Sequence, residues 1–158
     1  MYRTEWSLQQ MQAVRQTIAR ILGLHQEAEQ VLEEAYRTYG LIHRELAQAA
    51  TADSLVTLLR LRQAQPEHYA MLGEILEVES RLRLEDGDPA GGFSYAHKAL
   101  RLYLEAILDS PQEFFKTYAP KVGALEELLD DAGVGLSAPT KEQLDRFWEL
   151  EGTMPDRS

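Results

Sequence analysis

The sequence predicts an all-α fold, and three observations support this prediction. Apolar residues recur at alternating three- and four-residue spacing, as in Phe93, Ala96, Leu100, Tyr103 and Ile107, which places them on one face of a helix. Glycine and proline interrupt such segments where helices of ordinary length would end or begin. No run of β-branched residues alternates with the period of two that a strand requires. We therefore expect about six to seven helices and no sheet.

Two amphipathic helices are expected before residue 41. The first runs from about Glu5 to Leu22, and the second from His25 to about Tyr39. Gly23 and Gly40 are expected to end them, because glycine takes the left-handed conformation after a helix without a Cβ penalty. The stripe of the first helix passes through Met11, Val14, Ile18 and Ile21.

A leucine-rich helix is expected between Gly40 and Pro66. Residues 41–50 are interpreted as either a short helix or an irregular turn. The segment Thr51–Ser54 then offers several N-cap side chains before the helix. We expect its buried side to carry Leu55, Leu58, Leu59 and Leu61.

Two longer helices follow, and their ends are marked by proline and glycine. Pro66 is expected to open the first, because its missing N–H costs nothing in a first turn. That helix should stop at Glu85-Asp86-Gly87. Asp88 and Pro89 are the expected N-cap and first residue of the second, which Pro111 should close.

The C-terminal part gives a weaker helical pattern. We expect a helical turn at 112–118, a helix over 120–131 and a last helix capped by Thr140. Leu144, Phe147 and Trp148 should face the core. The chain is expected to form one domain over residues 1–152, followed by a disordered tail at 153–158.

Small residues repeat at a constant offset in two of the expected hairpins. The trio Gly23, Ala28 and Ala35 recurs 64 positions later as Gly87, Gly92 and Ala99. Small side chains seven residues apart let one helix approach another closely. The segment 87–103, with Ser80 at the crossing, resembles the turn and second helix of a tetratricopeptide (TPR) repeat. The resemblance covers residues 71–108 and departs from the pattern at Glu79 and Arg83, where the repeat has Leu and Tyr.

The whole chain also resembles an uncharacterised family of small bacterial TPR-like helical proteins. The shared order begins with Arg20-Ile21-Leu22-Gly23-Leu24 and the Gly40-Leu41 break, and continues through Leu55–Leu59 to the Gly-Asp hairpin. The resemblance implies TPR-like hairpins packed as an irregular right-handed bundle or short solenoid. It implies no known activity.

Composition excludes several classes of function. The net charge of −10 disfavours nucleic-acid binding, because phosphate recognition depends on Lys and Arg. No run approaches the roughly 18 apolar residues that a membrane span needs, so we expect no membrane partner and a cytoplasmic location. Cysteine is absent, which excludes disulfides and thiolate metal sites.

No catalytic or metal motif is found among the residues. The four histidines lack a Glu-x-x-His or His-Glu-x-x-His context, so no metal is expected. Gly91-Gly92 lacks the Gly-Lys-Ser/Thr ending of a phosphate-binding loop, and close helix packing explains it better. We therefore expect no enzyme, no catalytic residue and no cofactor.

The leading functional hypothesis is a protein-interaction module for an unknown protein or peptide partner. Stacked helical hairpins line a concave face with their first helices. The residues expected on that face are Gln10, Thr17, Arg20, Glu74, Glu77 and Arg81. The alternative is a homodimeric structural or regulatory protein, with a small ligand between helices, in which unburied residues such as Trp6 or Trp148 complete the core.

Overall fold

The computed structural model describes residues 12, 16, 28–39 and 41–153, and this part of the chain contains helices and no strand. Most of the expected first helix and most of its hairpin turn lie outside these residues, as do positions 154–158 of the expected tail. The all-α prediction is confirmed. The helices of residues 28–153 are α2 (Ala28–Tyr39), α3 (Arg44–Ala49), α4 (Ala52–Leu61), α5 (Pro66–Glu85), α6 (Pro89–Asp109), α7 (Pro111–Asp131) and α8 (Ala138–Thr153).

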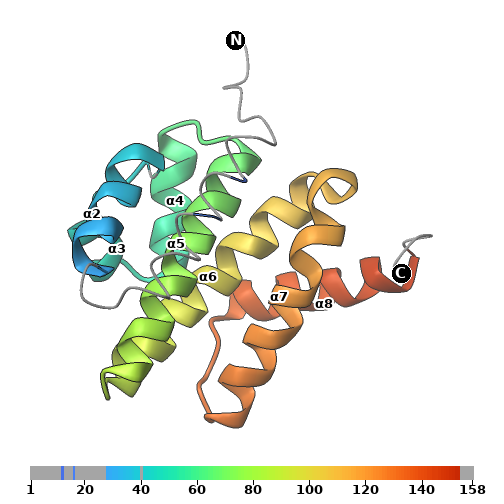
Figure 1. Cartoon of the computed structure of the whole chain (residues 1–158). Helices are drawn as coiled ribbons and strands as arrows, with labels where there is room; N and C mark the ends of the chain where they lie inside the picture. Colours follow the sequence, from blue (N-terminus) through green and yellow to red (C-terminus); the bar gives the residue numbers. More distant parts are fainter. Residues whose placement is uncertain (1–11, 13–15, 17–27, 40, 154–158) are drawn as a thin grey trace.

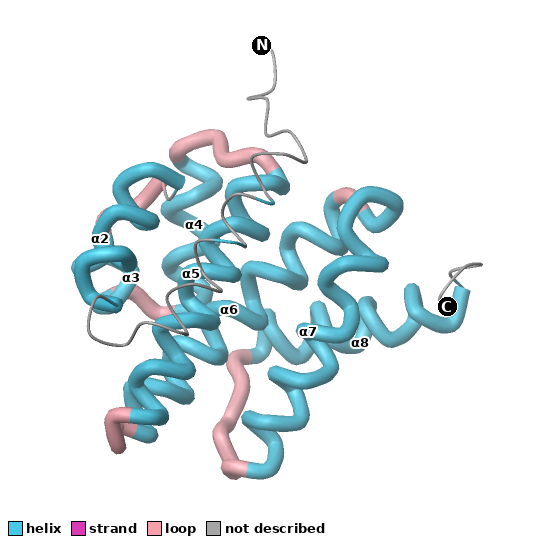
Figure 2. The backbone as a smooth tube through the Cα atoms, in the orientation of Figure 1, coloured by secondary structure: helices cyan, strands magenta, loops and turns pink. Residues whose placement is uncertain are grey.

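The antiparallel pair α5 and α6 forms the centre of the molecule. Helices α2, α3 and α4 lie on one side of this pair, and α7 and α8 lie on the other (Figure 1). Short loops join most of the helices, with a longer one between α7 and α8 (Figure 2). Within the described residues no helix has the length and apolarity that crossing a membrane would require.

Local signals set the ends of the central helices as the sequence predicts. Pro66 and Pro89 each occupy the first turn of a helix. The Asp88 carboxylate accepts the backbone N–H of Gly91 at 3.0 Å, which caps α6. Gly87 has φ of +81° in the turn between α5 and α6, a conformation that favours glycine. An additional cap was not expected: His68 and Gln65 form a reciprocal capping box at the start of α5.

Helices α5 and α6 cross closely where the sequence predicts small residues. The Ser80 hydroxyl donates to the carbonyl oxygen of Gly92 at 2.6 Å, so the two backbones nearly touch. A Cβ atom added at Gly92 would lie 2.5 Å from Cγ of Leu84. Ala99, seven residues after Gly92 on α6, is fully buried. The small residues are therefore required by the crossing.

Two expected helix boundaries are wrong. Residues 111–131 form one helix, α7, in which Pro120 is an interior residue. An interior proline costs about 3 kcal/mol, but buried residues on both sides of it, including Tyr118 and Val122, hold the helix in one piece. The last helix begins at Ala138, and Ser137 provides the cap that we expected from Thr140.

Two expectations for apolar side chains also require correction. Leu61 is 76% exposed, because it stands two residues after the buried Leu59 and therefore lies on the opposite face of α4. Trp148 is 41% exposed, whereas its neighbours Leu144 and Phe147 are buried as expected. The remaining predicted leucines divide: Leu55 and Leu59 are buried, and Leu58 is half-buried.

Candidate functional site

Of the residues predicted to face a partner, the structure describes Glu74, Glu77 and Arg81. Gln10, Thr17 and Arg20 lie outside the described residues. Glu74 and Glu77 on α5 are only 4% and 9% exposed. Arg81 is the exposed member of the described three, and its guanidinium lies 3.0 Å from Glu77. In the structure, this part of α5 is therefore mainly interior.

Two buried carboxylates of α5 accept hydrogen bonds from buried tyrosines. Tyr118 donates its hydroxyl to Glu74 at 2.9 Å, and Tyr103 donates to Glu77 at 2.6 Å. The two rings stack with centroids 5.0 Å apart. Burial raises the pKa of Tyr103, and the negative charge of Glu77 adds to the effect, so its hydroxyl stays protonated and remains a donor. This arrangement joins α5, α6 and α7 and presents no reacting group to solvent.

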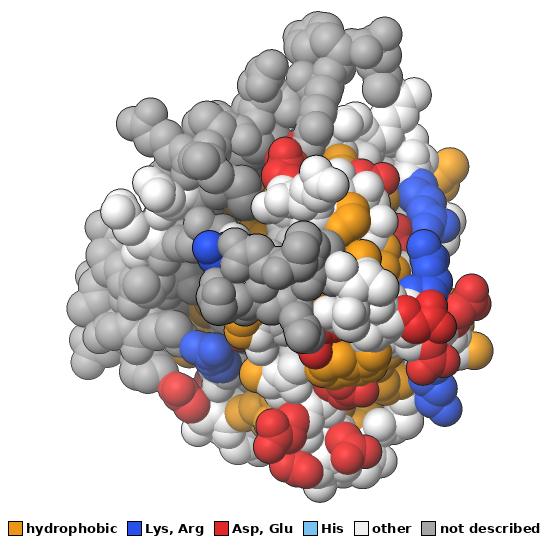
Figure 3. Space-filling view, turned by 90° about the vertical axis from the view of Figure 1, so that its right-hand side faces the viewer, with side chains coloured by type: hydrophobic (Ala, Val, Ile, Leu, Met, Phe, Trp, Pro, Cys, Tyr) orange, Lys and Arg blue, Asp and Glu red, His pale blue; other side chains and the backbone are white. Residues whose placement is uncertain are grey.

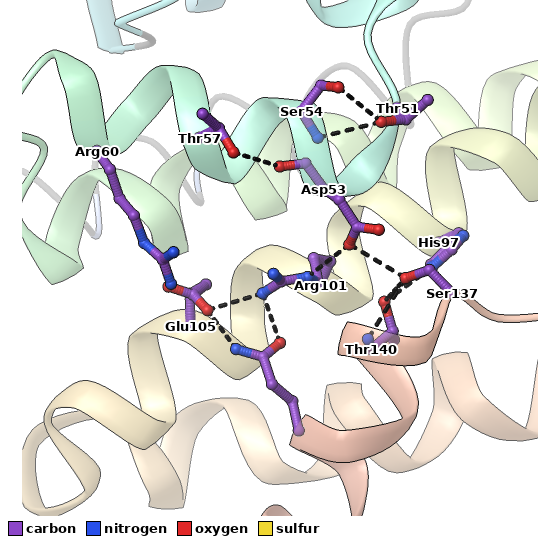
Figure 4. Close-up of polar contacts among 11 residues, drawn as sticks. Thr51, Asp53, Ser54, Thr57, Arg60, His97, Arg101, Glu105, Ser137 and Thr140 are labelled. Atoms are coloured by element: carbon purple, nitrogen blue, oxygen red, sulfur yellow. Dashed lines mark hydrogen bonds and ion pairs between the residues drawn. The ribbon is translucent and has the colours of Figure 1, made fainter.

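A second polar cluster connects α4, α6 and α8 around Arg101 (Figure 4). The Arg101 guanidinium lies 3.0 Å from Asp53 and 2.7 Å from Glu105. It also donates to the side-chain oxygen of Gln143 on α8 at 2.7 Å. Arg60 at the end of α4 contacts the other oxygen of Glu105 at 3.0 Å. One buried cation therefore fastens three helices together.

The same cluster continues through hydroxyl groups at the start of α8. Ser137 donates to Asp53 at 3.1 Å, and its oxygen lies 2.8 Å from that of Thr140. The ring nitrogen Nε2 of His97 lies 3.0 Å from the Thr140 hydroxyl oxygen. An open cavity of about 570 Å³ adjoins His97, Ser137 and Asp53. Thr140 is fully buried, and Ser137 caps α8, so these hydroxyls hold a helix end and do not resemble an activated nucleophile.

We expect His97 to make the stability of the protein depend on pH. Burial lowers its pKa; Asp53 opposes this effect, while Arg101 and Lys98 reinforce it. Folding therefore favours the neutral ring, and this contribution is present above the ordinary pKa of about 6.5 and is lost as the pH falls through the lowered pKa. Lowering the pH from about 8 to about 5 should reduce the free energy of unfolding of the wild type more than that of His97→Gln, as measured by urea unfolding at each pH. Equal losses in both proteins would contradict this assignment.

A groove runs between α7 and α8 on the opposite side from α2 and α3. It consists of two hollows of about 420 and 530 Å³, and Gly123 lines both. We call the first the Trp148 hollow; it is lined by Phe115, Lys116, Ala119, Pro120, Gly123, Trp148 and Glu151. We call the second the acidic hollow; it is lined by Gly123, Glu126, Glu127, Asp130, Val134, Gly135, Leu136 and Lys141. Figure 3 views this side and shows hydrophobic side chains gathered beside charged ones.

Trp148 is held at the junction of the two hollows. Its indole N–H donates to Glu126 on α7 at 3.1 Å, which orients the ring across the gap between the helices. The ring also meets Phe147 edge-on, with centroids 4.9 Å apart. Phe147 in turn stacks on Phe115 of α7 at 5.6 Å. A fixed and partly exposed aromatic ring is therefore available beside a hollow.

The described residues offer no metal site: they contain no group of three or more His, Asp or Glu side chains placed to hold an ion. Comparison with protein-family models, with curated proteins and with solved structures finds no match to this chain. The resemblance to TPR hairpins therefore rests on the residues of this sequence alone.

The sequence contains a signal for the groove that the helical pattern concealed. Pro120 and Gly123 are both poor helix residues, and they stand three apart in α7, outside its buried apolar stripe. Three-residue spacing puts them on one face of the helix. Both residues line the Trp148 hollow, so this face of α7 borders the groove. A pair of helix-weakening residues on one face thus indicates a surface that is kept open.

Proposed function

We propose that this protein is a non-enzymatic interaction module that binds a segment of a protein partner in the groove between α7 and α8. The observation that carries the proposal is the partly exposed ring of Trp148, which is fixed by Glu126 and borders an apolar hollow. Tryptophan is among the residues that contribute most to protein interfaces when a partner covers it. The buried clusters of the described residues, by contrast, are used to join helices.

Peptide binding is favoured over a small-molecule site by the shape of the groove. The two hollows are open and follow one another along α7, so they suit an elongated ligand that covers both. Small-molecule sites, by contrast, enclose most of the surface of their ligand. The exposed apolar side chain of Leu61 lies on α4, away from this groove, and offers a comparison residue.

We expect Trp148→Ala to weaken binding of peptides by at least about tenfold, because truncating a tryptophan hot spot costs about 2 kcal/mol or more and about 1.4 kcal/mol corresponds to tenfold. The full chain is used to select ligands from an array of synthetic peptides, and the affinities of those selected are measured for both proteins. Since Trp148 is partly exposed, the variant should remain folded and should lose less stability than a variant that truncates a fully buried ring.

Leu61→Ala is the matched control, because it also removes an exposed large apolar side chain. It should leave peptide affinity unchanged. If the selected peptides bind Trp148→Ala as tightly as the wild type, or if no peptide binds the intact chain above background, the proposed function is wrong.

A further inference from the structure

The charge of the groove is unevenly distributed along α7. The acidic hollow carries Glu126, Glu127 and Asp130 against a single lysine, Lys141. The Trp148 hollow carries one residue of each sign, Lys116 and Glu151. Glu127 and Asp130 are exposed side chains three residues apart, so they lie on one face of the helix. A ligand in the groove would therefore meet an apolar end and a negatively charged end.

Pro120 changes the backbone hydrogen bonding of α7 beside the apolar end. Pro120 has no N–H, so the carbonyl oxygen of Lys116 lacks the donor four residues along the helix that it would otherwise have. Both residues line the Trp148 hollow. An acceptor at this place, like the carboxylates of the acidic hollow, suits a ligand that brings N–H donors.

Gly123 keeps the two hollows continuous. It lies inside α7, where alanine would be the better helix residue. A Cβ atom added there would meet nothing within 4 Å, so the packing of the described residues does not demand glycine. A side chain at this position would project into the space that both hollows share. The absence of a side chain is explained if that space is occupied by another molecule.

We propose that the groove binds a basic amphipathic segment of a partner protein. An apolar anchor of the segment fills the Trp148 hollow, and a lysine or arginine of the segment pairs with Glu127 and Asp130. This inference rests on the proposed function and specifies its ligand. On α7 the Trp148 hollow is lined from residue 115 to 123 and the acidic hollow from 123 to 130, so their midpoints are about 7.5 residues, or about 11 Å, apart. The basic residue therefore lies about seven positions from the anchor in a helical segment, or about three in an extended one.

The experiment uses synthetic peptides with a leucine anchor and no tryptophan, in helical and extended spacings. Each has a lysine at the specified distance, and its partner has glutamate there instead. Binding is followed by the fluorescence of Trp148 in a Trp6→Phe background, which leaves one tryptophan in the chain. In at least one spacing, the lysine peptide should bind at least about tenfold more tightly than the glutamate peptide at low salt, and added salt should reduce the difference.

Charge reversal in the groove provides the decisive comparison. Glu127→Lys with Asp130→Lys should reverse the preference, so that the glutamate peptide binds better. The matched control is Glu34→Lys with Glu45→Lys, which changes the net charge equally through exposed residues of α2 and α3. This control should keep the preference of the wild type. The proposal is overturned if the two reversals have the same effect, or if the lysine and glutamate peptides bind equally in both spacings.

A third variant blocks the groove without weakening the helix. Gly123→Leu should abolish binding of the lysine peptide while the urea midpoint stays the same or rises, since leucine is the better helix residue. Unchanged binding in this variant would exclude the groove as the site. If the peptides selected from the array need Trp148 for binding but show no preference for basic residues, the proposed function stands and the inference about the partner fails.

Discussion

Replacing Glu79 with alanine is expected to lower the free energy of unfolding by about 3–5 kcal/mol, because it leaves a buried cation without its partner. Glu79 on α5 is 1% exposed and accepts two hydrogen bonds from Arg44, each of 3.0 Å. Tyr36 of α2 donates to the same carboxylate at 3.1 Å. Burial raises the pKa of Tyr36, and the charge of Glu79 raises it further, so the phenol remains a donor. Urea unfolding followed by circular dichroism would measure the loss.

The loss should arise from the unpaired charge and not from the removal of an attraction. Arg44 has two other acidic neighbours, Glu29 and Glu33, but both are exposed and their pairing is weakened by solvent. Replacing both ions with an apolar residue, in Arg44→Met with Glu79→Met, should therefore recover at least half of the stability lost in Glu79→Ala. If the double variant is less stable than the single one, the pair itself contributes the stability, and this explanation is wrong.

The burial of Glu79 also marks the limit of prediction from the sequence. Helix ends follow from neighbouring residues, so Pro66, Asp88 and Gly87 predict the α5–α6 hairpin correctly. Whether a face of α5 is exposed depends instead on which other helices surround it. Acidic residues occur around the α5 circumference, and helical periodicity alone assigns them to solvent. The structure covers Glu74, Glu77 and Glu79, and tyrosines or an arginine from other helices donate hydrogen bonds to them.

The candidate site was missed for a related reason. Residues 144, 147 and 148 all fit an apolar helical stripe, but adjacent residues point about 100° apart on a helix. Only the face that carries Leu144 and Phe147 is buried, so Trp148 remains at the edge. The groove also needs α7 to continue through Pro120, and the proline predicted a break. Tertiary packing, which keeps α7 intact, is not visible in the local pattern.

Helix α8 forms one wall of the groove, and Phe147 is the side chain that should hold it there. The ring is fully buried and stacks on Phe115 of α7. Phe147→Ala should lower the free energy of unfolding by about 3–5 kcal/mol, because it removes a large buried ring and leaves a cavity. Hydrogen exchange of the α8 amides should accelerate, since the helix loses its main apolar contact.

The same substitution should weaken peptide binding as much as Trp148→Ala, although Phe147 does not line the groove. Comparing the two variants therefore distinguishes a residue that positions α8 from a residue that contacts the peptide. Trp148→Ala removes a contact and leaves the α8 amides protected, whereas Phe147→Ala releases the helix that presents that contact. If Phe147→Ala retains full affinity while its α8 amides exchange rapidly, the ligand does not depend on α8, and the binding surface must lie elsewhere on the molecule.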